Sequence, residues 1–145
     1  MKRLKEGRVD ARERIRAPIA AVFEALSDHE GMARWPGIGA SSLLREGTPR
    51  NGVGALRRIT AGGLTLDEEV VAFEPPRRLE YTIRRGLPVT HLGIVTLVED
   101  GDVVEVRWQV EMSSSWPLLC PAVAVGLRWG LRRALRHVRA ELERR

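Results

Sequence analysis

The sequence is poor in several features that mark familiar classes of protein. It has one cysteine, Cys120, which excludes an intrachain disulfide, and its cysteine and three histidines lack the spacing of a zinc site. Its longest uncharged run, residues 112–127, contains three serines and two prolines. That run is shorter than the ~20 apolar residues of a membrane-spanning helix. We therefore expect no disulfide, no metal or other cofactor, and no stable membrane insertion.

The composition favours one globular domain. The chain has 145 residues, of which 43% are hydrophobic and 30% charged. We expect a single domain over residues 1–145, with residues 1–7 as a flexible tail. The charged residues near the start are not followed by the apolar core of a signal peptide, and the lone cysteine suits a reducing compartment. The expected location is the cytoplasm.

The positive charge is concentrated at the end of the chain. Of the net charge of +5, all comes from residues 128–145, which hold seven arginines and two glutamates. A nucleic-acid surface would recruit several elements, so we expect no nucleic-acid partner. A solvated helix face is the ordinary explanation of such a run, and an acidic partner or anionic membrane is the functional alternative.

Hydrophobic periodicity predicts the order of elements. A first strand is expected at residues 9–16, then a helix after Pro18 and a short helical turn at residues 32–35. Six more strands and a last helix, ending at residue 143 and beginning at 118 or at 122, follow. The six strands are expected at residues 41–45, 53–60, 64–73, 79–85, 90–98 and 104–112. Their short links predict an α+β fold with an antiparallel sheet.

Two segments carry the strongest patterns. Residues 104–112 alternate strictly, which places Val104, Val106, Trp108, Val110 and Met112 on the buried face of a strand. In the last helix an apolar stripe recurs at helical spacing and must cover the apolar face of the sheet. The stripe consists of Leu127, Leu131, Leu135, Val138 and Leu142.

One stretch carries a family resemblance. Residues 68–83 run Glu-Glu-Val-Val-Ala-Phe-Glu-Pro-Pro-Arg-Arg-Leu-Glu-Tyr-Thr-Ile, with Gly-Leu-Pro-Val at 86–89. Shorter matches lie at residues 35–36, 52–57, 95–97 and 106–108. In this order the fragments resemble the START-like, or polyketide cyclase/dehydrase and lipid transport, superfamily (SRPBCC). The chain departs from the family pattern at His91-Leu92, where relatives often carry an aromatic residue.

The resemblance implies a helix-grip, Bet v 1-like fold. About seven antiparallel strands would curve around the long C-terminal helix, in the order strand, two helices, six strands, helix. Between sheet and helix the resemblance implies a cavity for an apolar ligand. Members include aromatase/cyclase enzymes as well as binders of lipids and quinones.

Polar residues on the inward face are the candidates for chemistry. Strand parity places Arg57 and Glu68 inward on neighbouring strands, as a polar anchor for a ligand or as a structural ion pair. His91 could be an acid, a base or a hydrogen-bond donor in the cavity, or a structural histidine near its rim. Tyr81 could polarise a carbonyl of a ligand, or only pack in the core. His29, in a loop that ends a helix, is expected in solvent.

The expected cavity residues share the inward face of the sheet or of the last helix. They are Arg57, Glu68, Tyr81, His91, Val95, Val106, Trp108, Val110, Leu127 and Leu131. Gly126 and Gly130 cost about 1 kcal/mol each inside that helix. Such a pair can let another backbone approach or can leave room beneath the helix for a cavity, and the ordinary alternative is that it has no special role. No catalytic residue is assigned, because the chain has no nucleophile–base or phosphate-loop motif.

Three functions from different classes remain open. The first is a binder of a small hydrophobic molecule, lipid-like or polycyclic, in the cavity. The second is an enzyme of the cyclase/dehydrase kind that uses the same cavity. The third is an interaction protein that docks through the basic helix on an acidic partner or an anionic membrane.

Overall fold

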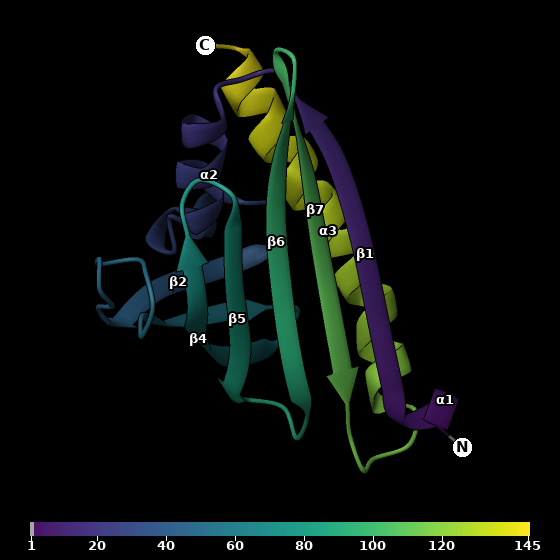
Figure 1. Cartoon of the computed structure of the whole chain (residues 1–145). Helices are drawn as coiled ribbons and strands as arrows, with labels where there is room; N and C mark the ends of the chain where they lie inside the picture. Colours follow the sequence, from purple (N-terminus) through teal and green to yellow (C-terminus); the bar gives the residue numbers. More distant parts are fainter. Residues whose placement is uncertain (1) are drawn as a thin grey trace.

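The computed structural model describes residues 2–145 and consists of one sheet and one long helix (Figure 1). Seven strands form a single antiparallel sheet in the order β1-β7-β6-β5-β4-β3-β2. The strands are β1 (Glu6–Ile15), β2 (Ile38–Arg45), β3 (Leu56–Ala61), β4 (Leu64–Glu74), β5 (Arg78–Arg85), β6 (Thr90–Asp100) and β7 (Val103–Ser113). The helices are α1 (Lys2–Lys5), α2 (Ile19–Ser27), the 3-10 turn η1 (Glu30–Arg34) and α3 (Leu119–Glu143). The predicted fold class is confirmed.

The sheet is held in register by its alternating side chains. In β7 the five predicted inward residues, Val104 to Met112 in steps of two, are all buried, while Glu105 and Glu111 are exposed. β7 pairs with β1 on one side and β6 on the other over its whole length. A slip of one residue would bury charges, so the pattern fixes the register. Figure 1 shows β2 lying at a steep angle to β1, so the sheet is strongly curved.

Helix α3 runs along β1 and packs on the concave side of the sheet (Figure 1). From the predicted stripe, Leu131, Leu135, Val138 and Leu142 are buried, and Leu127 is partly buried. Helix α2 closes one end of the sheet, where Phe23 and Phe73 of β4 meet with ring centroids 5.3 Å apart. The core therefore fills the end near α2 and the C-terminal half of α3.

The flexible tail predicted for residues 1–7 is replaced by regular structure from Lys2 onward. Lys2–Lys5 form a helical turn, and β1 begins at Glu6, opposite Ser113 of β7. Gly7 is buried because the backbone of α3 approaches it: an added Cβ would lie 2.6 Å from the carbonyl oxygen of Cys120. Only glycine permits this close approach. The contact could not be predicted from the sequence, because the residues around Gly7 are mostly charged. Met1 lies outside the described residues.

Candidate functional site

A cavity of about 480 Å³ lies between the concave face of the sheet and the N-terminal half of α3. β3, β4, β5, β6 and β7 provide one wall, and α3 provides the other. Most of the lining is apolar, and most of its polar side chains lie on the sheet wall. Those on the sheet wall are Arg57, Glu68, Tyr81 and His91, while Arg133 lines the cavity from α3.

The cavity wall contains a buried ion pair. Arg57 and Glu68 face each other across β3 and β4 and are only 2% and 7% exposed. The Arg57 Nε donates to Glu68 Oε1 at 2.9 Å, and Nη2 lies 2.9 Å from the same oxygen. The guanidinium also stands over the ring of Tyr81, 4.6 Å from its centroid. The pairing predicted from strand parity is present, under α3.

His29 completes the ion pair, contrary to the expectation that it lies in solvent. It is completely buried, its Nδ1 accepts a hydrogen bond from Arg57 Nη1 at 3.1 Å, and its Nε2 donates to the Asn51 carbonyl at 2.9 Å. Burial first, and then the charge of Arg57, lower the pKa of His29 to about 4. The neutral imidazole therefore accepts from Arg57 and helps to orient its guanidinium, while Glu68 supplies the counter-charge.

Tyr81 is fixed by two neighbours. Its hydroxyl accepts a hydrogen bond from Trp108 Nε1 at 2.9 Å, and its ring lies over Gly93 of β6. An added Cβ at Gly93 would lie 2.2 Å from Tyr81 Cζ, so only glycine leaves room for the ring. Burial raises the pKa of Tyr81 above its ordinary value, so the phenol keeps its proton at neutral pH. That proton remains able to donate.

His91 is held in one tautomer by the backbone. The regular pairing of β5 with β6 ends at Tyr81 and Gly93, and the Ile83 N–H donates to His91 Nδ1 at 3.2 Å. A neutral imidazole that accepts at Nδ1 carries its proton on Nε2. Burial lowers the pKa of His91, which keeps the ring neutral at pH 7. His91 therefore offers an N–H donor at the cavity wall.

The structure brings together most of the predicted cavity residues. Arg57, Glu68, Tyr81, His91, Trp108, Leu127 and Leu131 line the cavity. Val95, Val106 and Val110 do not, although all three are buried on the predicted face. Strand parity fixes the face of a side chain but not its place along the strand, and these three valines pack in the core instead.

The mouth of the cavity lies beside two glycines of α3. Gly126 and Gly130 both line the cavity, and an added Cβ at either would meet nothing within 4 Å. Trp129 also lines the cavity while its side chain is largely exposed. Both glycines are exposed, so the cavity opens to solvent beside them.

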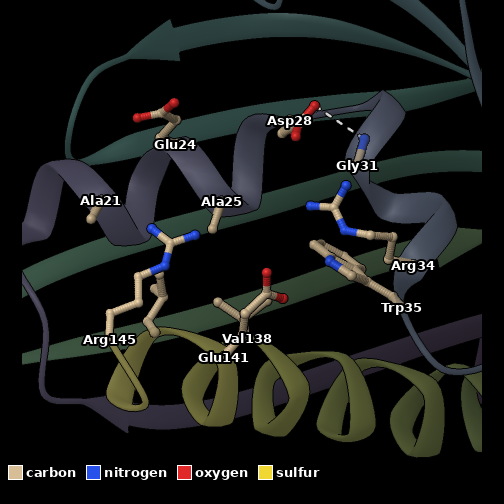
Figure 2. Close-up of a pocket in the computed structure, with 11 residues that line it drawn as sticks. Ala21, Glu24, Ala25, Asp28, Gly31, Arg34, Trp35, Val138, Glu141 and Arg145 are labelled. Atoms are coloured by element: carbon tan, nitrogen blue, oxygen red, sulfur yellow. Dashed lines mark hydrogen bonds between the residues drawn. The ribbon is translucent and has the colours of Figure 1, made fainter.

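A second, smaller cavity lies between α2, η1 and the end of α3 (Figure 2). Its volume is about 140 Å³, and charged side chains including Glu24, Asp28 and Arg145 surround it. Figure 2 shows the carboxylate of Asp28 turned to the Gly31 amide, which donates to it at 3.0 Å. The size and the charged lining suit water better than an apolar ligand, so we assign the site to the apolar cavity between the sheet and α3.

The described part of the chain contains no group of three or more histidine, cysteine or acidic residues placed to hold a metal ion. None of the described helices is long and apolar enough to cross a membrane.

The fold and the cavity define a class of protein. A curved antiparallel sheet closed by a long C-terminal helix is the helix-grip, or Bet v 1-like, fold. By sequence, the chain belongs to the family described as "Polyketide cyclase / dehydrase and lipid transport", whose model matches residues 6–143. The predicted superfamily is thus confirmed. Family and fold are consistent with binding of a hydrophobic ligand.

Solved structures share the fold at low sequence identity. A START superfamily protein from Mycobacterium smegmatis is 14% identical with a TM-score of 0.79, covering 94% of this chain and 97% of that one. Ara h 8.0201 is 13% identical with a TM-score of 0.77, covering 97% and 99%. Protein XoxI from Bacillus cereus is 19% identical with a TM-score of 0.73, covering 94% and 95%. No curated protein matches the sequence.

Proposed function

We propose that the protein binds a small hydrophobic molecule, lipid-like or polycyclic, in the cavity between the sheet and α3. The observation that carries this proposal is the cavity itself, about 480 Å³ with a largely apolar lining and a few polar groups gathered on one wall. That combination is typical of sites that bury most of a ligand and orient it by a small number of hydrogen bonds.

The polar wall favours a ligand with an accepting oxygen, such as a carbonyl. Tyr81 and His91 both present protons, because the Tyr81 oxygen already accepts from Trp108 and His91 Nδ1 accepts from Ile83. The positive charge of Arg57 beside them favours negative charge density on the ligand. An apolar ring system that carries a carbonyl or phenolate oxygen fits both the wall and the donors.

Binding is favoured over turnover by the state of the candidate bases. Glu68 accepts from Arg57, His29 Nδ1 accepts from Arg57, and His91 Nδ1 accepts from Ile83. A general base needs a free lone pair within reach of the substrate. His91 is the imidazole that lines this wall and its lone pair is already engaged, while Glu68 is held in an ion pair by Arg57, which supports a carrier over a cyclase or dehydrase.

Filling the cavity from α3 tests the proposal. Gly130→Leu should place a side chain in the space that the glycine leaves open. The probe is the fluorescent dye anilinonaphthalene sulfonate, an apolar ring system with an anionic oxygen group. We expect the wild type to bind it with enhanced fluorescence, and Gly130→Leu to weaken binding by about tenfold or more.

Ala140→Leu is the matched control, because Ala140 is exposed on the same helix and does not line the cavity. It should bind the dye as the wild type does. Equal dye binding by wild type and Gly130→Leu, with both proteins folded by circular dichroism, would contradict a ligand site in this cavity.

A further inference from the structure

Helix α3 carries an apolar surface that the sheet does not cover. Two large apolar side chains of its first half are mostly exposed, Val125 at 56% and Trp129 at 65%, and two more lie just before the helix, Trp116 at 60% and Leu118 at 61%. Val125 and Trp129 are four residues apart, so they lie along one line of the helix. This line is opposite the buried stripe, so the first half of α3 is apolar on two faces.

Arginines continue the same line. Arg132 and Arg136 follow Trp129 at the spacing of the exposed face and are themselves exposed. The sequence has no acidic residue from 112 to 140. Arg139 pairs with Glu13 and Glu143, whereas Arg132, Arg133 and Arg136 have no acidic partner within the described chain. The face therefore combines exposed apolar groups with uncompensated positive charge.

We propose that this face of α3 docks on an anionic lipid surface. Tryptophan rings are favoured at the boundary between headgroups and acyl chains, and arginines beside them bind anionic headgroups. The helix would lie on the surface and not cross it, because its leucine stripe is committed to the sheet. A second copy of the chain fits less well, since two such faces would bring their arginines together.

Docking in this orientation would place the cavity mouth at the lipid surface. Trp129 and Arg133 belong to the exposed region and also line the cavity, beside Gly126 and Gly130. A ligand could then pass between the bilayer and the cavity without crossing open water. The docking proposal rests on the exposed surface alone, so failure of cavity binding would leave it standing.

Vesicle binding by the full-length protein tests the proposal. The probes are vesicles of phosphatidylcholine alone and vesicles with about 30% phosphatidylglycerol, at low ionic strength. Trp35 and Trp108 are buried, so a blue shift of tryptophan emission reports mainly Trp116 and Trp129. We expect a blue shift and at least about tenfold tighter binding with the anionic vesicles, weakened by added salt.

Two variants separate the apolar and the charged contributions. Trp116→Ser/Trp129→Ser and Arg132→Glu/Arg136→Glu should each weaken vesicle binding by about tenfold or more. The controls are Val98→Ser, an exposed apolar residue on β6, and Arg12→Glu/Arg77→Glu, exposed arginines outside α3. Both controls should stay within about twofold of the wild type, apart from the small general effect of net charge.

Three results would overturn the proposal. The first is a wild type that does not bind anionic vesicles at low salt. The second is an α3 charge-reversal variant that binds as well as its control. The third is a wild type that ignores vesicles and dimerises by light scattering, with the tryptophan variant monomeric; the face would then be covered by a second copy. Circular dichroism and melting temperature establish that each variant is folded.

Discussion

At the scale of single residues, Arg57 organises the site. It donates to Glu68 and His29, contacts Met32 Sδ at 3.2 Å and stands over the ring of Tyr81. Every partner is buried, so the desolvation cost of the guanidinium is offset only while all of them remain. Such a pair contributes little net stability compared with apolar residues, yet it is costly to break. That asymmetry leads to the first prediction.

Glu68→Gln should destabilise the protein by about 3–5 kcal/mol, because it leaves the charge of Arg57 buried without a counter-charge. The measurement is urea denaturation at pH 7. The double variant Arg57→Met/Glu68→Leu removes both charges and should recover most of the loss. A single variant as stable as the wild type would contradict a charged, desolvated pair.

The buried imidazole of His29 predicts a dependence of stability on pH. Its folded pKa, about 4, is below its ordinary value of 6.5, so the unfolded chain binds more protons between these values. This contribution is complete above pH 6.5 and is lost as the pH falls toward 4, by about 3 kcal/mol. Urea denaturation at pH 7 and pH 4 should show a loss smaller by about this amount in His29→Gln. An equal loss in both proteins would contradict the burial of a neutral His29.

Part of this site could be predicted from the sequence, and the rest could not for a physical reason. Arg57, Glu68 and Tyr81 lie on strands, where alternation fixes the side that a residue faces. His29 lies at the end of a helix, where no such rule applies, and its burial depends on the Asn51 carbonyl and on Arg57. No local signal identifies it. Sequence also could not separate Val95 from Trp108, since both face inward.

At the scale of elements, α3 has to serve the core and the cavity together. Its C-terminal half is packed, with Leu135 completely buried, while Leu131 borders the cavity. Its N-terminal half contains the two glycines and the exposed apolar line. The stripe of leucines predicted this helix and its buried face from sequence. The second apolar face could not be separated from core residues, because tryptophans and valines are commonly buried.

Two leucines of α3 should differ in their contribution to stability. Leu135→Ala should lower the free energy of unfolding by about 4 kcal/mol, because it opens a new cavity in a filled core. Leu131→Ala should cost only about 2 kcal/mol, because part of its surroundings is already empty. Urea denaturation of both variants measures the difference. Equal losses would indicate that the space beside Leu131 is filled in solution.

Replacing either glycine of α3 by alanine should increase the stability of the folded protein. Gly126→Ala and Gly130→Ala should each stabilise the protein by roughly 0.5–1 kcal/mol, since an added Cβ meets no atom and alanine favours the helix. Thermal denaturation tests this. Gly93→Ala is the contrasting variant: its Cβ would collide with Tyr81, so it should destabilise. A loss of stability in the two α3 variants would contradict an open space beneath the helix.

At the scale of the whole molecule, the sheet and α3 are in close contact at one end and are separated by the cavity at the other. α2 and the C-terminal half of α3 fill the first end, and the cavity lies beside the N-terminal half of α3, with its mouth beside the exposed line of that helix. The order and type of the main elements could be predicted from the sequence, because several strands alternate clearly and the turns between strands carry proline or glycine. The volume of the cavity could not be predicted from the sequence, because it depends on the distance between the packed sheet and helix.

The most direct test of the account is a matched pair of ligands that differ only by an oxygen. 9-Fluorenone and fluorene share one ring skeleton, and only the first has a carbonyl to accept from Tyr81 and His91. Competition with the fluorescent dye gives both dissociation constants for the wild type and for Tyr81→Phe/His91→Leu. We expect both ligands to bind the wild type, and the variant to lose about fivefold or more of the preference for the ketone. Failure of both ligands to bind the wild type, or an unchanged preference in the variant, would contradict it.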